Sequence, residues 1–127
     1  MALRFVDAGH RKPPNPPHSW AVVAGRTLHA VHIPLRPDGS IETGDAAAQT
    51  EAALADLDAT LRPVSAAATD VAMVQIFLTS LDHKAAMDEA YRRYFPHPMP
   101  VRACVAVTAL PTPGTVVELV VTAQLPD

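Results

Sequence analysis

The chain has 127 residues, of which 49% are hydrophobic and 18% charged, and its formal net charge is −3. This composition predicts one folded domain and excludes a disordered chain. Basic residues are scattered, which argues against a nucleic acid or an anionic membrane as partner. One cysteine cannot form an internal disulfide, and neither a membrane span nor a signal peptide is recognisable. We therefore expect a soluble cytoplasmic protein.

Hydrophobic periodicity and turn residues predict the element order β-β-β-α-β-α-β-β. We expect strands over residues 3–6, 19–24, 28–33, 71–78, 100–108 and 116–123, and helices over residues 45–61 and 83–94. Residues 12–17 contain four prolines and should form an extended arm on the surface. Gly25 and Arg26 indicate a hairpin turn. Thr43 and Asp45 are both candidate caps of the first helix.

Two late strands each carry one charge in an otherwise apolar ribbon. Alternation places Arg102 and Cys104 on one face of residues 100–108 and only aliphatic side chains on the other, which we expect to face the core. An arginine is not buried without an anionic partner. Glu118 is the charge of the last strand, and we expect it to lie on the same sheet face as Arg102.

The element order favours an α+β fold in which both helices pack on one face of a mixed sheet. The opposite face, expected to carry Arg102 and Glu118, would also expose Met73, Phe77 and Val120. Sheets with an uncovered apolar face usually associate, so we predict a closed homo-oligomer. The site around Arg102 would then lie against a neighbouring subunit.

Several motifs resemble the Rid/YjgF family. The most specific are Pro-Val-Arg-Ala-Cys-Val-Ala-Val at residues 100–107, Leu-Pro at 110–111 and Val-Glu-Leu-Val at 117–120. Supporting motifs are Ile-Pro-Leu at 33–35, Ala-Gln-Thr at 48–50 and Val-Gln-Ile-Phe-Leu-Thr at 74–79. The resemblance implies one RidA-like domain over residues 1–127, with a chorismate-mutase-like fold that assembles as a homotrimeric barrel.

Members of the family's best-known branch hydrolyse reactive enamines and imines to 2-oxo acids and ammonia. The resemblance implies that Arg102 binds the substrate carboxylate, with which a planar guanidinium forms two parallel hydrogen bonds. It also implies that Glu118 orients or activates the attacking water and that the Cys104 backbone helps to hold it. No metal or organic cofactor is implied.

This chain departs from the family pattern around the expected substrate pocket. The usual Tyr-Ser-Gln, Ser-Gly-Gln and helical Asn are replaced by His18-Ser19-Trp20, Ala30-Val31-His32 and Asp88. By position, the resemblance implies substrate-binding roles for His18, Trp20, Ala30, Val31, His32 and Asp88. Each of the two histidines could act as acid or base near neutral pH, or could simply hydrogen-bond a backbone carbonyl. The spacing of His18, His29 and His32 could suggest a zinc site, but no cysteine or carboxylate completes a recognisable ligand pattern.

Three functions remain open from the sequence. The leading hypothesis is an imine or enamine hydrolase whose sites lie between subunits. The second is a diverged enzyme for another carboxylated substrate, with His18 and His32 as acid–base groups, which the lost Ser-Gly pair favours. The third is a non-catalytic module that binds a small carboxylate or a partner protein. Retention of both Arg102 and Glu118 argues against the third, because binding alone needs only the arginine.

Overall fold

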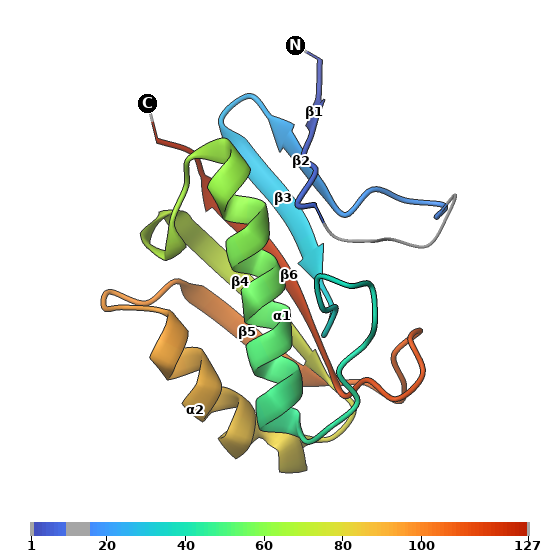
Figure 1. Cartoon of the computed structure of the whole chain (residues 1–127). Coiled ribbons are helices and arrows are strands. Elements are labelled where there is room, and N and C mark those ends of the chain that lie inside the picture. The colour runs from blue at the N-terminus through green and yellow to red at the C-terminus, as the bar shows by residue number, and fades with distance from the viewer. Residues whose placement is uncertain (1, 10–15, 127) are drawn as a thin grey trace.

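The computed structural model describes residues 2–9 and 16–126, in which both helices pack on one face of a single sheet (Figure 1). The strands are β1 (Arg4–Phe5), β2 (Ala21–Ala24), β3 (Thr27–His32), β4 (Val71–Leu78), β5 (Val101–Ala106) and β6 (Val117–Gln124), and the helices are α1 (Ala46–Leu61) and α2 (Lys84–Tyr94). The predicted order of elements is confirmed, with ends shifted by a few residues. Residues 12–15 of the predicted proline-rich arm lie outside the described residues.

The sheet has six strands in the order β1-β2-β3-β6-β4-β5. β6 pairs antiparallel with both β3 and β4, whereas β5 pairs parallel with β4 through the crossover that contains α2. β5 therefore forms one edge of the sheet and β6 lies inside it (Figure 1). Although β5 and β6 are consecutive in the sequence, β4 separates them.

Local chemistry sets where α1 begins and ends. Of the two candidate caps, Asp45 is the one used, and its carboxylate accepts the Ala48 N–H at 2.8 Å. Pro63 lacks an N–H and ends the α-helical ladder, so the chain passes into a 3₁₀ turn over Arg62–Val64. Gly25 has a φ of 62° in the β2–β3 turn, a conformation that side chains with a Cβ disfavour.

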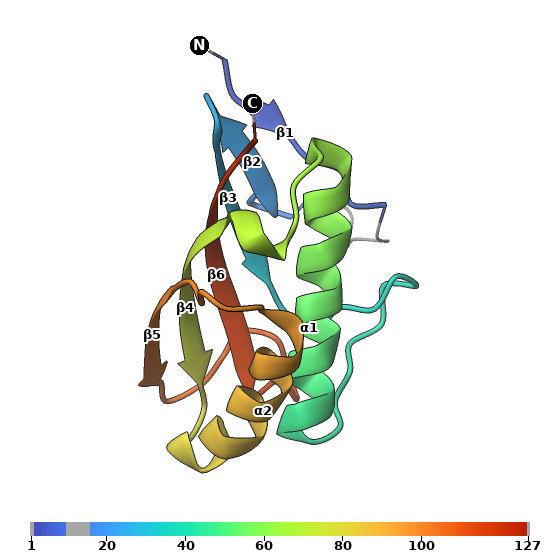
Figure 2. The same ribbon diagram turned by 90° about the vertical axis from the view of Figure 1, so that its left-hand side faces the viewer.

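The core lies between the sheet and the two helices, which Figure 2 shows on the same side of the strands. Its fully buried sheet residues alternate along the strands and include Leu28, Val74, Ile76, Leu119 and Val121. The helices contribute Leu54, Leu57, Leu61, Met87 and Tyr91 to the same cluster. Each such aliphatic side chain stabilises the fold by about 1.5–3 kcal/mol through removal from water.

A buried amide joins the start of α1 to the segment that leads into β6. The Gln49 Nε2 group donates to the carbonyls of Gly44 and Gly114 at 3.0 and 2.9 Å. Its Oε1 atom accepts the Val116 N–H at 2.7 Å. Because Gln49 is only 1% exposed, these three bonds satisfy an amide that would otherwise be buried without partners.

Neither described helix covers the other face of the sheet, which we call the open face. Strand alternation and register assign to it Val22, His29, Val31, Met73, Gln75, Phe77, Val101, Ala103, Val105, Glu118, Val120 and Thr122. Val101 and Val105 are 68% and 47% exposed, unusually high values for aliphatic strand residues. The predicted apolar, uncovered sheet face is thus present in the single chain.

The predicted orientation of β5 on the sheet is wrong. Arg102 pairs with Val74 and Cys104 with Ile76, both core residues of β4, so their side chains point to the helix face. The aliphatic side chains of Ala103 and Val105 lie on the open face instead. The reason is that α2 supplies an anionic partner for the guanidinium above this edge strand. Arg102 and Glu118 consequently lie on opposite faces of the sheet.

Candidate functional site

Arg102 lines a cleft between β5, α2 and the loop before β5. Its Nη1 atom lies 2.7 Å from Oδ1 of Asp88, and its guanidinium lies over the Tyr91 ring, 5.0 Å from the centroid. The cleft has a volume of about 390 Å³ and is lined by Lys84, Asp88, Tyr91, Arg92, His97, Met99, Pro100 and Arg102. We call it the Arg102 cleft. It orients the guanidinium through one ion pair and one aromatic face.

Asp88 is shared between two cations of this cleft. Its second oxygen accepts a hydrogen bond from Lys84 Nζ at 2.8 Å, one turn earlier on α2. Desolvation by burial acts to raise the pKa of Asp88, but the Lys84 hydrogen bond and the Arg102 charge outweigh it and hold the pKa below its usual value. Asp88 is therefore ionised at neutral pH and lies at the predicted pocket rim.

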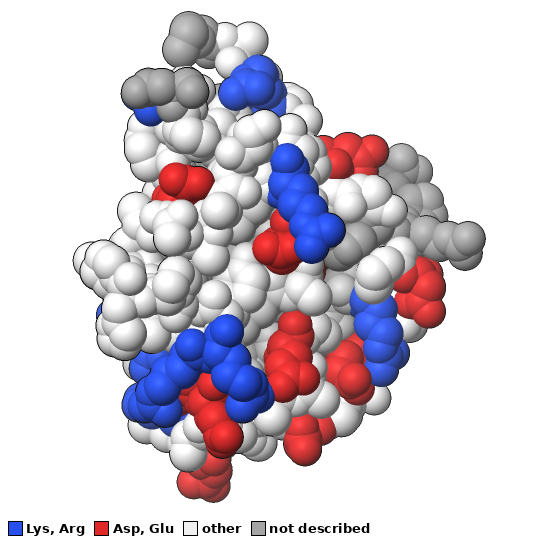
Figure 3. Space-filling view, turned by 60° about the vertical axis from the view of Figure 1, so that its left-hand side comes forward, with Lys and Arg blue, Asp and Glu red and all other residues white. Residues whose placement is uncertain are grey.

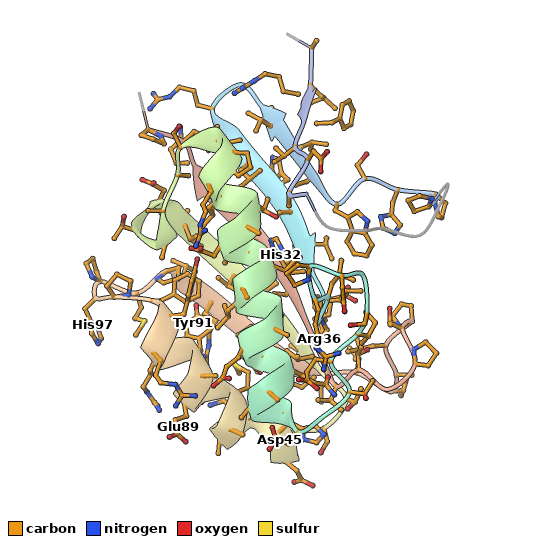
Figure 4. All side chains as sticks on the ribbon, viewed as in Figure 1. His32, Arg36, Asp45, Glu89, Tyr91 and His97 are labelled. Atoms are coloured by element: carbon orange, nitrogen blue, oxygen red, sulfur yellow. The ribbon has the colours of Figure 1, made fainter. Side chains whose placement is uncertain are left out.

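Tyr91 forms the buried wall of the cleft. The residue is 3% exposed, and its hydroxyl has no hydrogen-bond partner among the described residues. Burial raises the pKa of Tyr91 to about 12, against the opposing charge of Arg102. The phenol thus stays protonated and can donate a hydrogen bond. Figure 4 shows Tyr91 and His97 together at α2 and the loop that follows it.

Glu118 belongs to a second group of side chains, on the open face. The carboxylate is half-buried, and desolvation raises its pKa while the charge of nearby His18 acts in the opposite direction. The ring of His18 meets Trp20 edge to face, with centroids 4.6 Å apart. We call Glu118, His18 and Trp20 the Glu118 patch. A carboxylate with a raised pKa beside an imidazole is suited to accept and pass on a proton.

The Arg102 cleft and the Glu118 patch cannot act on one small molecule within one chain. Arg102 pairs with Val74, and Glu118 pairs with Phe77 on the opposite side of β4. From strand geometry their Cα atoms are about 14 Å apart, with side chains on opposite sheet faces. A site that uses both residues must therefore combine Arg102 of one copy with Glu118 of another.

Cys104 contributes its main chain rather than its thiol to the edge of the sheet. The side chain is half-buried and packs against the core. Val107 N–H donates to the Leu78 carbonyl at 2.7 Å, so by the two-residue period the main-chain groups of Cys104 point away from β4. These groups lie at the outer edge of β5, beside the Arg102 cleft, where they can bind water.

The remaining predicted pocket residues separate into two places. Trp20, Ala30 and Val31 line one shallow hollow of about 220 Å³ on the sheet. His32 does not join them, because it is 1% exposed and its Nδ1 atom lies 2.8 Å from Oδ2 of Asp56 on α1. The expectation that His32 lines the substrate pocket is therefore wrong: the sequence could not show that a carboxylate on α1 binds it inside the fold. Figure 4 shows His32 beside α1, away from Tyr91 and His97.

The described part of the chain offers neither a cluster of metal ligands nor a membrane-spanning helix. Within residues 2–9 and 16–126, no group of three or more His, Cys, Asp or Glu side chains could hold a metal ion. In the same ranges, no helix is long and apolar enough to cross a bilayer.

Six of the eight residues that line the cleft were not among the site residues expected from the sequence: Lys84, Tyr91, Arg92, His97, Met99 and Pro100. A signal was present, because Lys84, Asp88 and Arg92 follow one another at intervals of four residues and so share one face of α2. Met87 and Tyr91 lie on the buried side of the same helix. What the spacing could not show is that this face lies above Arg102.

Known proteins match both the sequence and the fold. The sequence model of the family described as Endoribonuclease L-PSP matches residues 9–125. A RutC family protein of Pyrococcus abyssi is 36% identical over 113 residues, which are 87% of this chain and 89% of the relative. Protein DfrA of Myxococcus xanthus is 39% identical over 123 residues, covering 94% and 93% of the two chains.

Among solved structures, a protein of unknown function of the conserved Rid protein family from Yersinia pestis superposes with a TM-score of 0.90. It is 28% identical, and the match covers 98% of this chain and 100% of the other. The fold is thus that of the YjgF/RidA-like, chorismate-mutase-like proteins. The chain belongs to the Rid/YjgF family, whose sequence model is the L-PSP model named above.

Proposed function

We propose that this protein hydrolyses reactive 2-imino and 2-enamino acids to 2-oxo acids and ammonia. The observation that carries the proposal is Arg102, a guanidinium oriented at the mouth of a cleft by Asp88 and Tyr91. The Oδ1 atom of Asp88 lies 2.7 Å from Nη1, and no other described residue forms a hydrogen bond with the Arg102 guanidinium. Its other nitrogens remain free to bind the substrate carboxylate as a charge-assisted pair. Membership of the Rid/YjgF family supports the same reaction.

The chemistry needs a positioned water and little else, because the imine carbon is already electrophilic. The water oxygen adds to C2 of the protonated imine while one water proton passes to Glu118, which gives a neutral tetrahedral carbinolamine. Glu118 then returns the proton to nitrogen. The C–N bond breaks, ammonia leaves, and the hydroxyl proton is lost as the C2 carbonyl forms. The raised pKa of Glu118 suits a group that both accepts and returns a proton.

A complete site requires assembly, because Arg102 and Glu118 lie on opposite faces of one chain. We propose the homotrimer that the family resemblance implies, closed through the apolar open face. Each site would then combine the Arg102 cleft and Cys104 edge of one subunit with the Glu118 patch of the next. His18, which lies near Glu118, is placed to assist proton transfer, whereas His32 is enclosed in the fold.

The test is release of 2-oxo acid and ammonia from 2-imino acids made in situ by an amino-acid oxidase, measured above spontaneous hydrolysis. We expect acceleration by the wild type and a loss of about 10- to 100-fold in Arg102→Ala, because a charge-assisted carboxylate contact is removed. Arg93→Ala is the matched control, since Arg93 pairs with Glu51 and Glu89 outside the cleft. No acceleration with small or bulky imines would refute the proposal.

Two alternatives are separated by further arms of the same experiment. In a binding module, Glu118→Gln would keep its affinity for carboxylates and there would be no turnover to lose. In an imine hydrolase, the same variant should bind but no longer accelerate hydrolysis. Because the matching family model is described as an endoribonuclease, cleavage of single-stranded RNA is assayed in parallel. The net charge of −3 leads us to expect none.

A further inference from the structure

The Arg102 cleft carries more positive charge than one substrate carboxylate would neutralise. Three of its lining residues are basic, Lys84, Arg92 and Arg102, and only Asp88 is acidic. In Figure 3 basic side chains gather low on the face that the view brings forward, in the region of α2. After Asp88 is counted, the cleft keeps two positive charges in a chain whose net charge is −3.

Among the three basic residues of the cleft, Arg92 is not held by a contact within the fold. It is exposed and forms no ion pair or hydrogen bond with any of the described residues. Its neighbour Arg93 behaves differently, binding Glu51 at 2.8 Å and Glu89 at 3.5 Å. Two adjacent arginines on one helix thus differ in kind: Arg93 serves the contact between α1 and α2, whereas Arg92 faces the cleft.

The cleft also holds an unused hydrogen-bond donor. Tyr91 lines the same cleft, and only 3% of its surface is exposed. Its hydroxyl has no hydrogen-bond partner among the described residues. A buried hydroxyl without a partner is unfavourable unless something binds it. Arg92, the exposed cation of the same cleft, is free to bind a polar group beyond the carboxylate that Arg102 takes.

We propose that the substrates are acidic 2-imino acids, which carry a second carboxylate on the side chain. Arg102 binds the carboxylate next to the imine carbon, and Arg92 with Lys84 binds the distal one. The two cations follow α2 at i and i+8, on either side of Asp88, so that they form one rim of the cleft. This inference rests on the proposed hydrolase and names its substrate class.

The test compares imines of different side-chain charge at equal concentration. D-Aspartate oxidase supplies imines with an acidic side chain, and D-amino-acid oxidase supplies neutral and basic ones; C2 is trigonal in the imine, so the chirality of the amino acid is irrelevant. We expect kcat/KM to be about tenfold higher for acidic than for neutral imines, mainly through KM. The preference should shrink as salt screens the rim charges.

Variants test which residues bind the distal carboxylate of the substrate. Arg92→Gln should lower the acidic-to-neutral ratio about fivefold, and Lys84→Gln should lower it less because Asp88 already binds Lys84. Arg93→Gln is the matched control on the same helix and should leave both rates unchanged. An equal kcat/KM for acidic and neutral imines, or a ratio that Arg92→Gln does not move, would overturn the inference while leaving the proposed hydrolase intact.

Binding gives a readout that does not depend on turnover. Titration with 2-oxoglutarate and with 2-oxobutyrate compares a dicarboxylate and a monocarboxylate that cannot be hydrolysed. We expect the dicarboxylate to bind more tightly in the wild type and the difference to vanish in Arg92→Gln. If no imine is hydrolysed but this difference is present, the hydrolase is refuted and the ligand class stands. If the two ligands bind equally, the ligand class is refuted.

Discussion

The Arg102 cleft and the Glu118 patch differ in what holds their side chains in place. Arg102 is fixed within the chain by the Asp88 carboxylate and the Tyr91 ring. Glu118 lies half-buried on an open sheet face, beside the exposed His18 and among apolar residues that no described helix covers. The first group is preorganised in one chain, whereas in the proposed function the second is completed by another copy. The proposal thus assigns substrate binding and proton transfer to opposite faces of one sheet.

The sharpest test of this division is complementation between two impaired variants. Arg102→Ala should lower imine hydrolysis about 10- to 100-fold, and Glu118→Gln should no longer accelerate it. If the two are unfolded together and reassembled at equal amounts, about a quarter of the sites should regain both groups, because each site draws one residue from each of two neighbours. The measurement is the specific activity of the mixed preparation.

Simple mixing of the variants without reassembly is the control for that experiment and should give no gain over the residual activity of the separate variants. Recovered activity on reassembly would place the two residues in different subunits. If reassembled mixtures show no such gain while each variant is trimeric, the site is not shared between copies.

A charge introduced on the open face should prevent assembly, so that the Arg102 cleft of one copy no longer meets the Glu118 patch of another. Val120→Asp places a carboxylate on the apolar open face, so we expect a folded monomer that lacks hydrolysis but retains carboxylate binding in the Arg102 cleft. Molar mass from light scattering and far-UV circular dichroism report on assembly and on folding.

Leu81→Asp likewise replaces an aliphatic side chain by a carboxylate, at a residue that is 57% exposed in the 3₁₀ turn before α2. It should leave the trimer intact. A trimeric Val120→Asp protein would show that the open face is not the interface.

Loss of the buried amide of Gln49 should destabilise β6, which carries Glu118, more than β5, which carries Arg102. Gln49→Leu leaves the Val116 N–H and two carbonyls without their partner, which should lower the free energy of unfolding by about 2–3 kcal/mol. Urea unfolding measures the loss. Hydrogen exchange should rise at the start of β6 and remain unchanged in β5, and equal increases in both strands would contradict this assignment.

The pH dependence of binding and of turnover should differ, because the two carboxylates shift in opposite directions. The raised pKa of Glu118 means that it takes up a proton above the usual glutamate value of 4.5, while Asp88 stays ionised below 3.8. As the pH falls, turnover should decline about tenfold per unit below the pKa of Glu118, while binding in the cleft persists.

The pKa shifts of Asp88 and Glu118 also affect the stability of the fold in opposite ways as the pH changes. Pairing of ionised Asp88 stabilises the fold above its unfolded pKa of 3.8, and this contribution is lost as the pH falls through its lower folded value. The contribution of Glu118 is present at low pH and is lost as the pH rises through its raised folded pKa. Glu118→Gln should therefore stabilise the chain near neutral pH and make no difference in acid. Urea unfolding at both pH values checks the sign.

The elements and their order were predictable because hydrophobic period and turn residues are local signals. Alternation correctly put Arg102 and Cys104 on one face, but it cannot say which face meets the core. On β5 both faces carry aliphatic residues, and the contact of Arg102 with Asp88 and Tyr91 decides between them. The prediction that His32 lines the pocket failed because its partner Asp56 lies 24 residues away in the sequence, on α1, and local patterns do not show such a contact.

β6 is synthesised after every other element of the sheet, yet it lies between β3 and β4. While the ribosome is still adding residues 117–124, β3 and β4 have no strand to separate them, and both present unpaired backbone groups and apolar side chains. The domain therefore cannot fold progressively as it emerges, because its longest-range pairings form last. During that interval the nascent chain exposes two open strand edges, which can pair with strands of other chains until β6 fills the gap.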